Sequence, residues 1–185
     1  MLNLAIIIGS TRPTRVGASV GDWVYEHARQ RDGAKYELVD ILDYNLPLLD
    51  EPKPPSSGDY SKDHTKKWSE KISQFDGFIF VSPEYNHSTC GALKNALDFL
   101  YKEWNNKAAG FVAYGGAGGT RAVEHLRLIC AELQIATVRN QLALSLRDDF
   151  ENGNNFNPRK HQAKQLEGVL GQLEKWAGAM RELRS

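Results

Sequence analysis

The chain begins with a pattern that predicts a buried strand, a polar turn and then a helix. Leu4 to Ile8 form an unbroken apolar run that stops at Gly9, and hydroxyl and guanidinium side chains follow. An apolar helical periodicity starts near Val16. Free backbone N–H groups and the positive end of the helix dipole meet at such a junction. The pattern therefore predicts an α/β fold with a phosphate site in the first loop.

The residues of this loop exclude two common phosphate motifs. Thr14 and Arg15 stand where a P-loop has its second glycine and its lysine. Thr11 and Thr14 stand where a dinucleotide fingerprint has its second and third glycines. The hydroxyl and guanidinium donors that remain suit a terminal phosphomonoester better than a pyrophosphate. The alternative is an ordinary turn with solvated arginines.

Length and composition indicate a single domain. The chain has 185 residues, and 23 basic residues balance 23 acidic ones, so no net field recruits nucleic acid or an anionic membrane. No apolar run approaches the roughly 20 residues that span a bilayer, and no signal peptide precedes the first strand. Cys90 and Cys130 form neither a disulfide framework nor a metal-ligand spacing. We expect one cytoplasmic domain over 1–185, without nucleic-acid or membrane partners.

Short apolar runs alternate with helical patterns along the whole chain. Near-continuous apolar runs in the middle strands are typical of a parallel sheet covered by helices on both faces. The predicted strands are Leu4 to Ile8, Tyr36 to Ile41, Gly77 to Ser82, Ala108 to Tyr114 and, with a weaker pattern, Ile135 to Val138. Such βα units in series predict a doubly wound α/β fold, in which ligands bind outside the carboxyl ends of the strands.

The segments between the strands divide into amphipathic helices and polar loops. The helical stripes run from Val16 to His27, Trp68 to Phe75, Ala92 to Leu100, Val123 to Leu133 and Pro158 to Met180. We interpret Pro47 to Tyr60 and Asp148 to Asn157 as surface loops. The helical residues Trp23, Trp68 and Trp176 are expected in the core. Trp104 follows a helix and can shape a pocket or an interface.

Two further loops leave strand ends with unusual residues. In the second loop, Ser82 to Cys90, the ring of Tyr85 and the amide of Asn86 can line a planar heterocycle and read its polar edge, although a capped turn is the alternative. The third loop, Tyr114 to Arg121, is dense in glycine, which lets backbone N–H groups approach a flat ligand or simply reverses the chain. Its glycines are Gly115, Gly116, Gly118 and Gly119.

Together the three loops resemble those of the NADPH-dependent FMN reductase family, the flavodoxin-like oxidoreductases that include quinone, azo and chromate reductases. The matching motifs are Gly9-Ser10-Thr11-Arg12, Pro83-Glu84-Tyr85-Asn86, Leu93-Lys94-Asn95-Ala96-Leu97-Asp98 and Gly115 to Arg121. The motifs are short, but the resemblance covers nearly the whole chain in order and spacing. The resemblance implies a flavodoxin-like parallel sheet of five strands in the order 2-1-3-4-5, with helices on both faces.

The resemblance further implies FMN as the bound cofactor and NADPH or NADH as the electron donor. Hydride would pass through flavin N5 to a quinone, an azo compound, free flavin or a similar small acceptor, so no side chain is expected to be catalytic. The expected phosphate contacts are Ser10, Arg12, Arg15, Val16 and Gly17. The expected ring contacts are Pro83, Glu84, Tyr85 and Asn86 on one side and Gly115, Gly116, Gly118 and Gly119 on the other. The family also implies a homodimer or a dimer of dimers.

Several residues near these motifs have more than one possible role. Arg15 departs from the family pattern and can either strengthen the phosphate site or reach toward the 2′-phosphate of NADPH. Glu84 can neighbour the flavin or pair with an arginine at a subunit contact. We interpret His87 as a residue of the cleft rim. Cys90 stands in the first turn of a helix, which can activate a thiol, but we interpret it as a small buried residue.

Two alternative functions remain open from the sequence. A one-electron flavodoxin-type carrier shares the fold, but such carriers are typically acidic and lack arginines like Arg12 and Arg15 in the phosphate loop. The other alternative is a flavin-free α/β domain that binds a different phosphate ligand. The three loops do not favour it, because they contain no nucleophile paired with a base and no acidic cluster for Mg²⁺.

Overall fold

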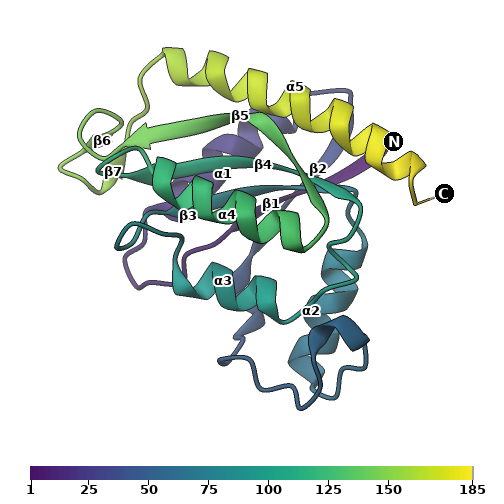
Figure 1. The fold of residues 1–185 in the computed structure, drawn as a ribbon. Coiled ribbons are helices and arrows are strands. Elements are labelled where there is room, and N and C mark those ends of the chain that lie inside the picture. Colours follow the sequence, from purple (N-terminus) through teal and green to yellow (C-terminus); the bar gives the residue numbers. More distant parts are fainter. Residues whose placement is uncertain (185) are drawn as a thin grey trace.

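The computed structural model describes residues 1–184, and its main sheet has five parallel strands in the order β2-β1-β3-β4-β5 (Figure 1). The strands are β1 (Leu2–Ile8), β2 (Ala34–Asp40), β3 (Gly77–Pro83), β4 (Lys107–Gly115) and β5 (Ile135–Ser145). Every pairing between them is parallel. The predicted fold class and strand order are confirmed.

Helices cover both faces of the sheet. On one face lie α1 (Gly17–Ala28) and α5 (His161–Glu182), and on the other lie α2 (Asp63–Ser73), α3 (Gly91–Asp98) and α4 (Thr120–Glu132). Two short 3-10 helices, Ile41–Tyr44 and Pro55–Ser57, follow β2. Every residue of β3 and β4 is buried, as expected for strands covered on both sides. The core therefore consists of two apolar layers, one on each face of the sheet.

The strand order reverses at β1, which pairs with β2 on one side and with β3 on the other. In an open α/β sheet, ligands bind outside the carboxyl ends of the strands at such a reversal. The loops that follow β1 and β3 leave the sheet at this point, on the left of Figure 1. The topology thus places the first and second loops at the general ligand position of the fold.

Strand β5 is longer than the sequence pattern predicts and continues beyond Val138 to Ser145. It is an edge strand, so it is covered less completely and polar residues interrupt its apolar run. The polar segment 148–157 is more than a plain loop, because it contains the hairpin of β6 (Phe150–Glu151) and β7 (Asn155–Phe156). Phe150 anchors this hairpin in the core at 5% exposure.

The tryptophans correct two of the sequence expectations. Trp68 and Trp104 are both buried, so Trp104 belongs to the core and not to a pocket or an interface. Trp176 is 47% exposed, and the expectation that it lies in the core is wrong. Helix α5 turns its apolar stripe onto the sheet through Leu173 and Ala177, which leaves Trp176 on the flank of the helix.

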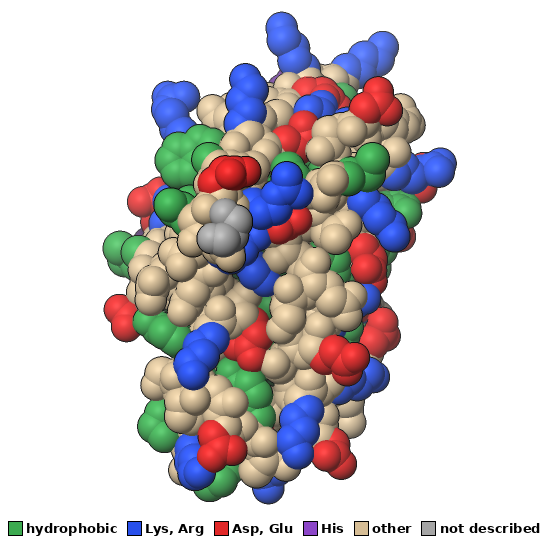
Figure 2. All heavy atoms as spheres, turned by 90° about the vertical axis from the view of Figure 1, so that its right-hand side faces the viewer, with side chains coloured by type: hydrophobic (Ala, Val, Ile, Leu, Met, Phe, Trp, Pro, Cys, Tyr) green, Lys and Arg blue, Asp and Glu red, His purple; other side chains and the backbone are tan. Residues whose placement is uncertain are grey.

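The surface mixes charges of both signs. Figure 2 shows acidic and basic side chains interspersed over one face, without a large patch of a single sign. This mixture agrees with the balanced formal charge of the chain. Among residues 1–184, no helix is long and apolar enough to cross a membrane.

Candidate functional site

The three loops form one continuous surface at the carboxyl edge of the sheet. The Tyr85 hydroxyl lies 3.3 Å from the Ser10 hydroxyl and accepts a hydrogen bond of 3.2 Å from Arg12 Nε, so the first and second loops touch. The second and third loops meet where the Glu84 N–H donates to the Tyr114 carbonyl at 2.9 Å. The structure thus brings together loops that are far apart in the sequence.

The first loop offers hydrogen-bond donors that the protein itself leaves available. Helix α1 follows Val16, whose apolar side chain makes no capping bond, so no N-cap side chain satisfies the first-turn N–H groups. Ser10 is 1% exposed and its hydroxyl accepts a hydrogen bond of 3.4 Å from the Arg12 backbone N–H, whereas the Arg12 residue is exposed. Within residues 1–184, Arg12 forms no ion pair. A hydroxyl, an unpaired guanidinium and an uncapped helix start are the donors that bind a phosphomonoester.

Arg15, in the same loop, pairs instead with Asp40, the last residue of β2. Arg15 Nη1 donates to the Asp40 carboxylate at 3.0 Å, and Nη2 makes a second short contact with the same group. Nη1 also donates to the Ser10 carbonyl at 2.6 Å. The β1–β2 register places Ile8 beside Asp40, so the carboxylate lies next to the start of the loop. The side chains are 13% and 19% exposed, and the pair ties the loop to the neighbouring strand.

The second loop contains a tight two-residue turn. Tyr85 and Ser88 exchange backbone hydrogen bonds of 2.9 and 3.1 Å. Asn86 and His87 lie between them with φ angles of 47° and 72°. Two consecutive left-handed residues are characteristic of a type I′ hairpin turn. Tyr85, Asn86 and His87 are all exposed, so the turn presents an aromatic ring, an amide and an imidazole at the rim of the site.

Glu84 connects the second loop to helix α4. Its carboxylate accepts hydrogen bonds from the Arg121 backbone N–H at 3.1 Å and from Arg121 Nε at 2.5 Å, and its side chain is 3% exposed. Burial alone would raise the pKa of Glu84, but the hydrogen bonds from Arg121 outweigh it and hold this pKa below its ordinary value. Glu84 therefore pairs with an arginine of its own chain.

Different structural requirements explain the individual glycines of the third loop. Gly118 and Gly119 adopt positive φ angles of 69° and 73°. A Cβ on Gly115 would lie 3.0 Å from the Cβ of Glu84, so a side chain there would push against the second loop. Gly116 is exposed, and a Cβ there would meet nothing within 4 Å. Of these glycines, Gly116 is the one that neither backbone conformation nor packing explains.

Cys90 is a small buried residue, as interpreted from the sequence. It is 2% exposed, and its Sγ donates to the Gly9 carbonyl at 3.1 Å. Burial raises the pKa of the Cys90 thiol, which is opposite to the shift that a reactive cysteine needs. Its contact joins the end of β1 to the start of α3.

Sequence reasoning missed the roles of Asp40, Tyr114 and Arg121. Tyr114 is the next-to-last residue of β4 and is buried, and a Cβ on Gly17 would lie 2.7 Å from its hydroxyl. The glycine at the start of α1 therefore allows the Tyr114 phenol to approach the first loop. Each missed residue lies near a strand end or a helix start at the carboxyl edge of the sheet. The sequence pattern could therefore have predicted that these residues lie near the site. Their partners depend on strand register, which local patterns do not contain.

Comparisons with known proteins identify the family. The model of the NADPH-dependent FMN reductase family matches residues 2–149. An NAD(P)H-dependent FMN reductase of Schizosaccharomyces pombe is 37% identical over 183 residues, which cover 97% of this chain and 89% of the relative. An NAD(P)H-dependent FMN reductase of a Nectria species is 42% identical over 128 residues, which cover 66% of this chain and 64% of the relative, or less than two thirds of its length.

Solved structures agree at the level of the fold. FerB, a flavoenzyme NAD(P)H:(acceptor) oxidoreductase of Paracoccus denitrificans, matches with a TM-score of 0.77 at 19% identity. The match covers 97% of this chain and 99% of that one. The chain therefore belongs to the NADPH-dependent FMN reductase family, a family of NAD(P)H-dependent flavin oxidoreductases whose cofactors are FMN and NAD(P)H.

The Glu84–Arg121 pair yields a pH-dependent stability prediction. A lowered carboxyl pKa stabilises the fold above the unfolded-state pKa, and this stabilisation is lost as the pH falls through the folded-state pKa. We expect Glu84→Gln to lower the free energy of unfolding by about 1–3 kcal/mol at pH 7. The difference from the native chain should shrink below about pH 4.

Urea unfolding of both chains between pH 7 and pH 3 measures this difference. Glu124→Gln is the matched control, because Glu124 is an exposed carboxylate on the same helix α4. If the stability difference between Glu84→Gln and the native chain stays constant over the whole pH range, the ionised Glu84 carboxylate does not stabilise the fold through its pair with Arg121.

Proposed function

We propose that the first loop binds the phosphate of FMN through Ser10, Arg12 and the N–H groups at the start of α1. The observation that carries this assignment is the unpaired Arg12 guanidinium beside a buried hydroxyl and an uncapped helix. These groups fit a dianionic phosphomonoester, because each can donate a hydrogen bond to it and two supply positive charge. Val16 and Gly17 contribute through their backbone at the helix start.

We place the flavin ring between the exposed turn of the second loop and Gly116. Tyr85 and Asn86 present polar and aromatic groups there, and Gly116 leaves open space for a flat ligand. Five further residues support this surface without being exposed at the turn. Pro83 and Gly115 do so as strand ends, Glu84 through its hydrogen bonds with Arg121, and Gly118 and Gly119 through their left-handed backbone. The Tyr85 hydroxyl touches the phosphate loop, so this side chain couples the two halves of the cofactor site.

The proposed reaction is the oxidation of NADPH or NADH with reduction of a quinone, an azo compound, free flavin or a similar small acceptor. When bound, FMN supplies the hydride chemistry at N5, and the chain supplies binding and orientation. The phosphate contacts hold the cofactor from one end, while the exposed turn leaves room at the other for a second ligand. No side chain of the loops is required as nucleophile or general base.

We expect Arg12→Ala to weaken FMN binding about 10- to 100-fold, because a charge-assisted contact to phosphate is lost. Ser10→Ala should have a smaller effect of about 3- to 10-fold. Quenching of FMN fluorescence on titration with flavin-free protein measures both changes. Arg29→Ala is the matched control, since Arg29 is an exposed arginine at the opposite end of α1. If Arg12→Ala binds FMN with the affinity of the native chain, Arg12 does not contact the phosphate.

The activity itself is tested by NADPH- and NADH-dependent reduction of a benzoquinone with and without FMN. The reductase assignment requires turnover that depends on FMN. Arg12→Ala should regain most of this turnover at saturating FMN, because the phosphate contact lies away from the reacting ring. A protein that binds FMN without such turnover would be a carrier, and one that binds no FMN would be the flavin-free alternative.

We propose that Arg15 positions the phosphate loop and does not itself bind a phosphate. Both of its Nη atoms are engaged by the Asp40 carboxylate and the Ser10 carbonyl. Through the carbonyl it sets the backbone of the residue whose hydroxyl faces the cofactor. Asp40 also accepts a hydrogen bond of 3.0 Å from the Leu42 N–H, so the brace is anchored in the segment after β2.

Asp40→Asn distinguishes positioning from direct binding. If Arg15 positions the loop, losing its anionic partner should weaken FMN binding by about 3- to 10-fold, and the effects of Arg15→Lys and Asp40→Asn should not add. If Arg15 binds phosphate directly, Asp40→Asn should leave FMN affinity unchanged or increase it, because the guanidinium is released. FMN fluorescence titration of the two single variants and the double variant distinguishes these alternatives. Asp43→Asn, at a neighbouring carboxylate, is the control.

We propose that two copies of the chain associate as a homodimer, alone or within a dimer of dimers, through the outer surface of α3 and α4. Leu128 on α4 is 74% exposed and borders a hollow of about 520 Å³ beside Ser88 and Gly91. This surface continues the second loop, so a partner there would approach the flavin site. Leu128→Glu should halve the mass found by light scattering, and Leu183→Glu, at another exposed leucine, should leave it unchanged. An unchanged mass in Leu128→Glu would contradict this interface.

We also propose that the chain acts as one unit in the cytoplasm. Cys90 and Cys130 are both free and buried, which suits a compartment that keeps thiols reduced. Cell fractionation tests this location. The preference between NADPH and NADH follows from the same assays that test activity.

A further inference from the structure

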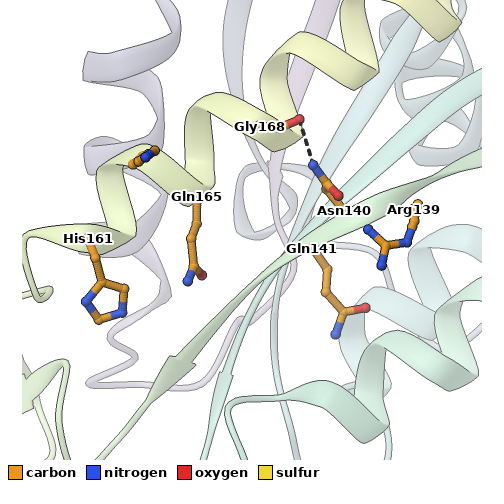
Figure 3. Close-up of a pocket in the computed structure, with 7 residues that line it drawn as sticks. Arg139, Asn140, Gln141, His161, Gln165 and Gly168 are labelled. Carbon is orange, nitrogen blue, oxygen red and sulfur yellow. Dashed lines mark hydrogen bonds between the residues drawn. The ribbon is translucent and has the colours of Figure 1, made fainter.

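A hollow of about 620 Å³ lies between the edge strand β5 and helix α5, outside the three loops of the flavin site (Figure 3). Its size is within the range of small-molecule sites. The residues that line it are Arg139, Asn140, Gln141, His161, Lys164, Gln165 and Gly168. In Figure 3 the side chains of His161 and Gln165 come from α5 and those of Arg139 and Gln141 from β5.

One wall of the hollow is an irregularity in β5. Ala109 and Phe111 of β4 pair with Thr137 and Gln141 of β5, so β5 has more residues than β4 over this stretch. Such a bulge re-aims side chains and is frequent beside functional sites. The extra residues include Arg139, which is exposed. The bulge therefore places a guanidinium on the open side of the sheet edge.

Helix α5 holds the bulge from one side through Asn140. The Asn140 N–H donates to Gln172 Oε1 at 2.9 Å, and Asn140 Nδ2 donates to the Gly168 carbonyl at 3.3 Å. A Cβ on Gly168 would lie 3.1 Å from Asn140 Nδ2. The glycine thus lets the strand amide close on the helix backbone, and the wall is fixed by specific contacts.

Arg127 of α4 holds the bulge from the other side. It donates to the carbonyls of Val138 at 2.7 Å and Arg139 at 3.1 Å. It also donates to Gln141 Oε1 at 3.2 Å. Because the amide oxygen of Gln141 is engaged in this way, its NH₂ group remains as a donor for the hollow.

The hollow has positive charge and no acidic lining residue. Arg139 and Lys164 line it, and Arg127 lies directly behind Gln141. Within residues 1–184, none of these three cations takes part in an ion pair. In a chain with no net formal charge, the two lining cations Arg139 and Lys164, without a lining carboxylate, are a local excess of positive charge. Guanidinium, ammonium and amide donors facing one space favour an anion with several oxygens.

We propose that this hollow binds a small, multiply charged oxyanion. A single monovalent ion would leave most of the space and the donors unused, whereas a diphosphate or a tricarboxylate can contact Arg139, Lys164 and the Gln141 amide together. The site shares no residue with the flavin loops, and its occupancy does not depend on the proposed flavin function.

Isothermal titration calorimetry of the FMN-saturated protein with pyrophosphate, and separately with citrate, tests this site at constant ionic strength. We expect saturable binding of at least one probe, and the two probes separate phosphate from carboxylate preference. Arg139→Gln and Lys164→Gln should each weaken it at least about fivefold, because a charge-assisted contact is lost. Lys175→Gln is the matched control, since Lys175 is an exposed lysine on the same helix outside the hollow.

The proposal is overturned if neither probe saturates, or if Arg139→Gln and Lys164→Gln both keep native affinity. It is also overturned if Arg12→Ala abolishes probe binding, because the anion then occupies the phosphate loop. The same titration of protein without flavin separates this proposal from the flavin assignment. We expect the probe to bind the hollow in that protein too, whether or not the chain binds FMN. Native melting temperatures of the variants show that they are folded.

Discussion

The burial of the central strands between two helical layers is the constraint on which the site depends. β3 and β4 are buried along their whole length, and β1 is buried except at Asn3. Apolar burial at about 25 cal/mol per Å² favours this arrangement over any in which polar groups enter the strands. Polar side chains can therefore leave the sheet only where strands end. Because the strands are parallel, Ser10, Asp40 and Glu84 all emerge at the same edge.

Contacts between the loops then divide the polar groups into two kinds. Some form ion pairs that hold the loops in place, and we call these groups braces; others keep hydrogen-bond donors that no carboxylate of the described residues occupies. Arg15 and Glu84 are used within the protein, one by Asp40 and the other by Arg121. Each pair connects segments that have no local relation, so the loops are held before any ligand arrives. Within residues 1–184, Arg12 has no carboxylate partner, and its guanidinium is the group proposed to bind the ligand. Two arginines in the same short loop thus have different roles because only one of them lies within reach of a carboxylate.

A related arrangement recurs at the far edge of the sheet. Arg127 satisfies the carbonyls of the β5 bulge in the way that Arg15 satisfies the Ser10 carbonyl. In both places an arginine fixes irregular backbone, and a neighbouring cation, Arg12 or Arg139, forms no ion pair with the part of the chain that the structure describes. The flavin loops and the proposed oxyanion site are therefore separate surfaces built by the same means. The edge position of β5 makes the proposed oxyanion site possible, since among residues 1–184 no further strand pairs with its outer edge.

The sequence by itself determined the βα alternation, the central strands and the three loops, because continuous apolar runs and helical periodicity are local consequences of burial. It also identified Cys90 correctly as a small buried residue. It did not reveal the end of β5, since an edge strand lacks the apolar run that two-sided burial imposes. It did not reveal the partners of Arg15 and Glu84, because strand register and loop packing bring distant residues together. Only the tertiary structure decided which charged groups are braces and which remain free for ligands.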